Sequence, residues 1–163
     1  MTLMLCYLAI NCKDCNTSFT LLNDIDAVDL SSNGPNTFFC TTTKQIVQMN
    51  YSGKILNNQI IAKKATEKCK SDTLPDCNRI EANYNGNFFV IDFSGNMFYI
   101  KVIAPETYAI ECVEHSEKFV DVGCNINGIC FAADEKNTLF RVNLINEVPV
   151  LEKYFKVKRE SRR

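Results

Sequence analysis

The sequence contains no tryptophan, only one histidine and no long apolar segment. A membrane-spanning helix needs about 18 or more consecutive apolar residues, and no run in the chain reaches that length. The single histidine, His115, cannot supply a paired-histidine zinc motif, and the sequence lacks a G-x-S-x-G nucleophile motif. The net charge of −1 gives no general attraction to nucleic acid. We therefore expect no membrane span, no nucleic-acid partner, and no resident cofactor or metal.

Cysteine, in contrast, is abundant, with nine residues among 163. Cys12 and Cys15 have the spacing of half a zinc site, but no second pair of this kind follows them. Disulfides formed in an oxidising compartment explain the cysteines better than zinc does. The alternative is that they are reduced and buried as small apolar side chains.

The N-terminal residues 1–24 form a candidate signal segment. Residues 2–10 (TLMLCYLAI) are apolar, but no positive charge precedes them and no clear small-residue cleavage site follows, so a β-strand is the alternative. Asn16 and Asn50 begin N-x-S/T triplets, the acceptor pattern for N-glycosylation. Together with the cysteines, these features predict a secreted glycoprotein.

A stretch near the C-terminus has the pattern of a β-hairpin. Residues 127–143 (NGICFAADEKNTLFRVN) contain an apolar run, a polar turn and an alternating run, and residues 85–101 (NGNFFVIDFSGNMFYIK) repeat the pattern 42 residues earlier. The shift aligns the residues that define the hairpin: Phe89 with Phe131, Asp92 with Asp134, Phe98 with Phe140, and Gly95 with Asn137. Glycine and asparagine both tolerate the positive φ of a tight turn. The hairpin is therefore one part of a repeating unit.

The repeat predicts an all-β fold with three four-stranded units in one domain, residues 25–163. The units cover residues 25–62, 78–115 and 117–155, and the fourth strand of the first unit is expected at 54–62. The first unit is the loosest match, because Phe38 precedes Phe89 by 51 residues rather than 42. The extra length lies in a polar insertion loop, residues 62–77, and residues 156–163 form a basic, solvated tail.

Two architectures use three or more such units: a β-propeller, which arranges them as blades around an axis, and a β-trefoil, which closes a barrel with three. Residues 128–143 (GICFAADEKNTLFRVN) and 44–56 (KQIVQMNYSGKIL) resemble YWTD- or NHL-type propeller blades. Over residues 25–155 the chain is similar to secreted insect β-propellers of the ommochrome-binding kind, although it has only about half of a ring.

This resemblance implies a non-enzymatic, secreted protein that binds a small apolar, pigment-like ligand or a protein partner. It also implies a partial ring, which a homodimer would complete. A β-trefoil would instead suggest a cytokine, a growth factor or a lectin-like protein. A third alternative is a metal-dependent hydrolase of the lactonase-like propeller class.

Three residues are candidates for chemistry. His115 would need an orienting carboxylate to act as a base, and Glu114 or Glu117 lies close in sequence. We favour an exposed loop histidine, because no nucleophile motif accompanies it. Asp92 and Asp134 occupy equivalent positions and could hold a metal. We favour a structural role for both, because an aspartate that opens a turn usually accepts hydrogen bonds from the backbone that follows.

Two disulfides are expected. Cys69 and Cys77 lie near the ends of the insertion loop, and a bond between them would tether it. Cys124 and Cys130 flank the Asn127–Gly128 turn and lie nearly opposite each other in an antiparallel hairpin centred there. The alternative for the second pair is burial on opposite faces of the sheet.

Overall fold

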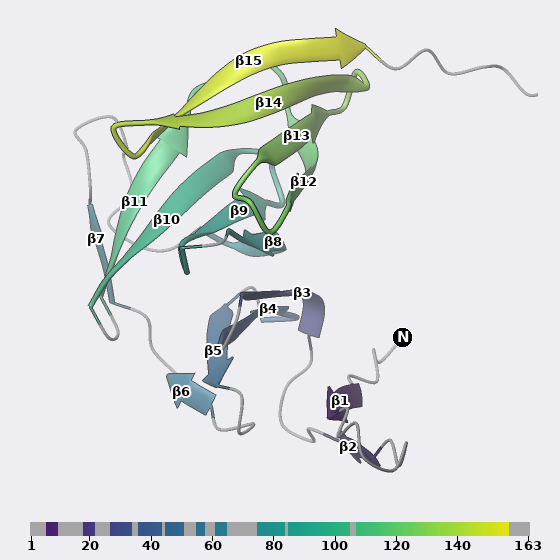
Figure 1. Cartoon of the computed structure of the whole chain (residues 1–163), viewed down its shortest axis with the longest axis vertical. Coiled ribbons are helices and arrows are strands. Elements are labelled where there is room, and N and C mark those ends of the chain that lie inside the picture. The colour runs from purple at the N-terminus through teal and green to yellow at the C-terminus, as the bar shows by residue number, and fades with distance from the viewer. Residues whose placement is uncertain are drawn as a thin grey trace, which may run out of the picture.

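The computed structural model describes residues 6–9, 18–21, 27–33, 36–43, 45–50, 55–57, 61–64, 75–83, 85–104 and 107–156. Every regular element in these ranges is a β-strand. β1 (Cys6–Ala9) and β2 (Ser18–Leu21) form a two-stranded sheet, and the other strands form three larger sheets (Figure 1).

The three larger sheets follow one another along the chain. Sheet I contains β3 (Ala27–Asn33), β4 (Asn36–Thr41), β5 (Ile46–Asn50) and β6 (Ile55–Asn57). Sheet II contains β8 (Cys77–Ala82), β9 (Phe88–Asp92), β10 (Met97–Ala104) and β11 (Thr107–Val113), with β7 (Ile61–Lys64) at its outer edge. Sheet III contains β12 (Phe119–Cys124), β13 (Cys130–Asp134), β14 (Thr138–Ile145) and β15 (Val148–Lys156). These separate sheets confirm the all-β repeat and do not form the barrel of a trefoil.

The prediction for the end of the first unit was wrong in one respect. The expected strand at 54–62 is two strands: β6 closes sheet I, and β7 leaves it to pair in parallel with β11 of sheet II. The predicted insertion loop therefore begins with a strand, and residues 65–74 lie outside the described ranges. Apolar patterning identifies a strand but not its sheet, because pairing with β11 depends on residues more than 40 positions away.

Sheet II has a neighbour on each face, and its interior strand β9 is buried on both sides. Phe88 and Val90 of β9 pack with sheet I, whereas Phe89 and Ile91 pack with sheet III. All four side chains are at most 1% exposed. Full burial of such a side chain stabilises the fold by roughly 1.5–3 kcal/mol. This double burial explains why β9 is a continuous apolar run instead of an alternating one.

The turns of sheets II and III confirm the 42-residue repeat. In the β9–β10 turn, Asp92 accepts hydrogen bonds from the backbone N–H groups of Ser94 and Asn96, both at 2.8 Å. Asp134 accepts the equivalent bonds in the β13–β14 turn, at 2.9 and 2.7 Å. Positive φ occurs at the aligned positions: Gly86 and Gly128, and Gly95 and Asn137.

The disulfides agree with one prediction and contradict the other. Cys124 and Cys130 are directly paired across β12 and β13, with their Cα atoms 4.1 Å apart, and they form a disulfide. Cys77 is bonded to Cys40 rather than to Cys69, so the predicted Cys69–Cys77 bond was wrong. Cys69 lies outside the described residues.

The Cys40–Cys77 bond joins two sheets across their shared core. Cys40 lies on β4 and Cys77 begins β8, and both side chains are fully buried in the cluster between sheets I and II. The prediction failed because it paired Cys77 with a cysteine that is close in sequence and did not consider partners on another sheet. The packing of two sheets brings these residues, 37 positions apart, to a Cα separation of 5.3 Å.

We predict that Cys40→Ala with Cys77→Ala destabilises the protein more than Cys124→Ala with Cys130→Ala. The first bond closes a chain segment of 37 residues and the second only six. On the chain-entropy account the losses in unfolding free energy are about 4 and about 2 kcal/mol. Urea unfolding of both double variants measures the difference, and the opposite order would contradict the role given to the Cys40–Cys77 bond.

Candidate binding surface

The strand directions bring four connections to one end of sheets II and III. Alternate connections of an antiparallel meander lie at the same end of the sheet, which groups β8–β9 with β10–β11 and β12–β13 with β14–β15. The Glu81–Cys124 and Lys101–Glu147 contacts show that these ends of sheets II and III lie side by side. Six of the exposed large apolar side chains occur here: Val102, Ile103, Ile126, Ile129, Ile145 and Val148. We call this set the apolar end. Exposed apolar side chains gathered at one end of a soluble protein often mark an interaction site.

Ile126 is the most exposed of these residues, at 90%, and it lies on a rigid loop. The Cys124–Cys130 disulfide closes the loop, and the side-chain oxygen of Asn125 accepts hydrogen bonds from the backbone N–H groups of Asn127 and Ile129. The equivalent β8–β9 connection has Ala82 and Phe88 at the cysteine positions. The β8–β9 connection forms the same turn with Ala82 packed opposite Phe88. A turn of this kind therefore does not require a disulfide.

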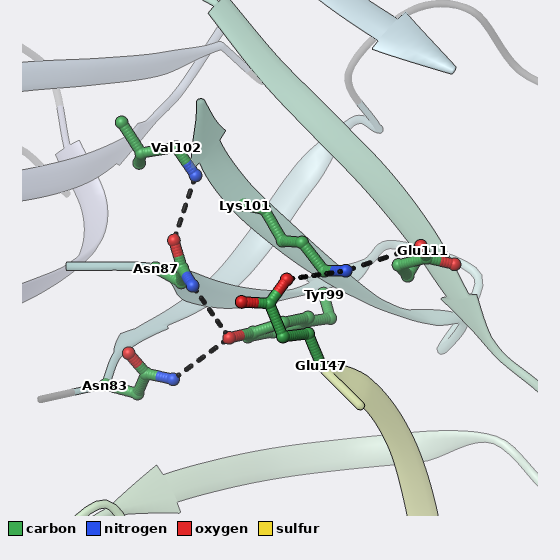
Figure 2. A network of polar contacts seen from close by, with 7 residues as sticks. All are labelled: Asn83, Asn87, Tyr99, Lys101, Val102, Glu111 and Glu147. Carbon is green, nitrogen blue, oxygen red and sulfur yellow. Dashed lines mark hydrogen bonds and ion pairs between the residues drawn. The ribbon is translucent and has the colours of Figure 1, made fainter. Parts of the chain in front are cut away.

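A buried polar cluster supports the next part of the surface (Figure 2). The Tyr99 hydroxyl accepts hydrogen bonds from the side-chain amides of Asn83, at 3.3 Å, and Asn87, at 2.9 Å. The side-chain oxygen of Asn87 accepts a third bond from the backbone N–H of Val102. The cluster thus ties the end of β10, which carries Val102 and Ile103, to the β8–β9 connection.

Lys101 links sheet II to the β14–β15 turn of sheet III (Figure 2). Its ammonium group lies 3.7 Å from Glu111 and 3.5 Å from Glu147. Glu111 is buried, whereas Glu147 is exposed and has a positive φ of 63°. The exposed pair contributes little stability. The contact shows that the turn between Ile145 and Val148 lies beside sheet II, but the ion pair does not hold the turn there.

Glu81, on the innermost strand of sheet II, connects all three sheets. One carboxylate oxygen accepts a hydrogen bond from the Ser31 hydroxyl of β3, at 2.9 Å, and the other from the backbone N–H of Cys124, at 2.8 Å. Sequence analysis missed Glu81, since a single glutamate in a strand carries no local signal. The bond to Cys124 fixes the position of the disulfide-closed loop 124–130 relative to sheets I and II.

His115 and Asp134 lie at the opposite end. The His115 ring packs between Phe119 and Phe140, with centroids 4.9 and 4.6 Å away, and its Nε2 atom lies 3.8 Å from Asp134. Glu117 binds Lys136 instead. The expected exposed loop histidine is therefore a largely buried residue of the core between sheets II and III, and the carboxylate that its Nε2 atom approaches, Asp134, is distant in sequence.

Asp92 and Asp134 have the predicted turn role. Burial raises the pKa of Asp134, but hydrogen bonds from the backbone and side chain of Thr138 and from the backbone of Lys136 outweigh it, and His115 adds to their effect. The net pKa of the Asp134 carboxyl lies below its ordinary value. Within the described ranges, no three histidine, cysteine, aspartate or glutamate side chains gather as metal ligands.

The remaining sequence candidates fall at the margins of the described residues. Asn16 lies outside them, and Asn50 is the last residue of β5. Lys156 ends β15, so the rest of the predicted basic tail also lies outside. Among the residues described, no helix is long and apolar enough to cross a membrane.

Comparison with solved structures identifies the fold as a β-propeller. The chain is similar to the β-propeller domain of Cps50 (Swd1) from Myceliophteria thermophila, with a TM-score of 0.58, 11% identity, and coverage of 80% of this chain and 43% of the other. It is similar to AztD from Citrobacter koseri, with a TM-score of 0.57 and 6% identity over 89% of this chain and 37% of the other. YCF48 bound to D1 peptide gives a TM-score of 0.51 and 11% identity, over 76% and 40% of the two chains.

The chain thus spans about two fifths of the length of these structures. No protein-family model and no curated protein matches the sequence. The identities are too low to indicate more than the fold. The expected propeller is confirmed, and sheets I, II and III are its blades.

We predict that Asp134→Asn destabilises the protein by about 1–2 kcal/mol at neutral pH, because the ionised carboxylate accepts the hydrogen bonds of a buried turn. Since the folded pKa is lowered, the ionised group stabilises the fold above the unfolded value near 3.8, and this contribution disappears as pH falls through the folded pKa. Unfolding free energies of both proteins between pH 7 and 2.5 measure the gap. A gap that widens towards low pH would contradict the assignment.

Asp92→Asn is the matched control. It alters the equivalent turn, where the hydrogen bonds of the carboxylate are exposed. We expect a smaller loss of stability at neutral pH than for Asp134→Asn.

Proposed function

We propose that the protein is a non-enzymatic, secreted binding protein of the β-propeller type that recognises an apolar segment of a protein or peptide. The observation that carries this proposal is the apolar end. It exposes six aliphatic side chains, with Ile126 at 90%, Ile103 at 61% and Ile145 at 56%. Exposed aliphatic groups gain free energy when a partner covers them.

The rigidity of the surface supports a role in recognition. A disulfide and two side-chain hydrogen bonds hold the loop of Ile126, and the Tyr99 cluster holds the end of β10. A preorganised surface loses less conformational entropy when it binds. These features are difficult to explain as fold requirements, since the equivalent β8–β9 connection forms without a disulfide.

The comparisons agree with this choice of partner but do not establish it. YCF48, one of the structures with the same fold, was solved with a bound D1 peptide. The resemblance to secreted insect propellers suggests instead a small apolar, pigment-like ligand. We favour a protein or peptide because the apolar groups are spread over the exposed ends of four connections.

Secretion is supported by the Cys40–Cys77 and Cys124–Cys130 disulfides, which require an oxidising compartment. Glycosylation at Asn16 and Asn50 stays a prediction. The enzyme alternative, a metal-dependent lactonase-like hydrolase, finds little support, because hydrogen bonds within their own turns engage both Asp92 and Asp134. The cytokine and lectin alternatives depended on a trefoil.

We predict that random 12-residue peptides selected for binding to the immobilised chain are rich in apolar residues and bind at the apolar end. Ile126→Asp should weaken a selected peptide at least tenfold, because it places a charge at the centre of the surface. Fluorescence anisotropy with the labelled peptide measures the affinity, and thermal unfolding checks that the variant is folded.

Phe93→Asp is the matched control. Phe93 is 56% exposed but follows β9 at the other end of the sheets, so peptide affinity should not change. Peptides that bind both variants equally well would contradict the proposed surface. Turnover of a lactone or ester panel that a chelator abolishes would overturn the non-enzymatic assignment.

A further inference from the structure

The outward face of sheet III, which is turned away from sheet II, repeats a face that is buried elsewhere in the molecule. The 42-residue shift relates its apolar side chains to those with which sheet II contacts sheet III: Phe131 to Phe89, Ala133 to Ile91, Leu139 to Met97, and Phe155 to Val113. The sheet II residues are 0–8% exposed. Phe155 is 47% exposed, so the outward face has the chemistry of an interface between sheets without its partner.

The aromatic rings of the outward face are already assembled. Tyr154 packs against Phe131 and Phe155, with ring centroids 5.4 and 5.3 Å apart, and is 59% exposed. Val150 extends the face and is 42% exposed. Arg141 occupies the position of the buried Tyr99, which makes the face more polar than the internal interface, as expected for a contact between separately soluble chains.

Sheet I has a free face at the other end of the series. Asp29 and Ser31 of β3 accept hydrogen bonds from β8, so they point towards sheet II. Side chains alternate along a regular strand, and Leu30, which lies between Asp29 and Ser31, therefore points away from sheet II and is 43% exposed. Val28, beside it, is 37% exposed. In the described part of the chain, this exposed face of sheet I is equivalent in the repeat to the face of sheet III that packs against sheet II.

We propose that a second copy of the chain covers the outward face of sheet III with the free face of its sheet I. The same contact, made twice about a two-fold axis, closes a ring of six sheets. Within one chain, the face of sheet II that corresponds to the outward face of sheet III is covered by sheet III. The covering face of sheet III corresponds to the free face of sheet I, so the free face of sheet I should fit the outward face of sheet III. Six blades lie within the range of closed propellers, and closure leaves no apolar face exposed.

Sedimentation equilibrium of the chain tests the proposal. We expect a mass of about 37 kDa, twice that of the 18.5-kDa chain. Phe155→Glu should give a folded monomer at concentrations where the unmodified chain is dimeric, because it places a charge on the outward face. Phe93→Glu, at a similarly exposed position outside this face, should remain dimeric.

The arrangement is tested by cross-linking a mixture of isotopically heavy and light copies. Links between copies should join β14 or β15 of one to β3, β4 or β5 of the other. A monomer at all concentrations, a dimer unaffected by Phe155→Glu, or links confined to β15 of both copies would each overturn the proposal. Phe155→Glu should still bind a selected peptide at the loop of Ile126, so this contact can fail while the proposed function stands.

Discussion

The fold depends on the burial of apolar side chains between neighbouring large sheets. A sheet with two apolar faces needs a neighbour on each side, and sheet II has both. Phe88 packs with sheet I and Phe89 with sheet III, although they are adjacent in sequence. The radial series of sheets in Figure 1 follows from this requirement, because no pair of sheets can satisfy it alone. The Cys40–Cys77 disulfide lies within the same apolar layer and holds two sheets that would pack without it.

Hydrogen bonds between the innermost strands give this apolar packing a fixed register. Asp29 accepts from the backbone N–H of Ile80, Ser31 accepts from that of Ala82, and Glu81 accepts from that of Cys124. An apolar interface tolerates small slides at little cost, whereas a hydrogen bond is directional. β8 and β12 also present backbone donors on the side where no further strand pairs with them, and side chains of the preceding sheet accept hydrogen bonds from these donors. The connection that carries Ile126 thereby has a defined position relative to the other two sheets.

The sequence was sufficient to predict the features that depend on neighbouring residues. The turns of Asp92 and Asp134, the positive φ of Gly95 and Asn137, and the Cys124–Cys130 bond all follow from hairpin chemistry over a few positions. It was insufficient where a residue meets a distant partner, as in the Cys40–Cys77 bond, the pairing of β7 with β11, and the approach of His115 to Asp134. The apolar end was missed because its residues are scattered in sequence and meet only when the strand directions are known.

The path of β7 has a consequence for how the molecule comes apart. The chain leaves sheet I, runs along the outer edge of β11, and then returns to form β8 on the inner side of sheet II. Sheet II thus has β7 at its outer edge and β8 at its inner edge. The Cys40–Cys77 bond closes the segment that contains β7 into a loop, so tension along the chain passes through the disulfide and leaves β7 in place. In the described part of the chain, no edge strand from another sheet pairs with sheet III in this way. Under a pulling force or partial denaturation, sheets I and II should open as one cooperative unit, and sheet III should detach as another.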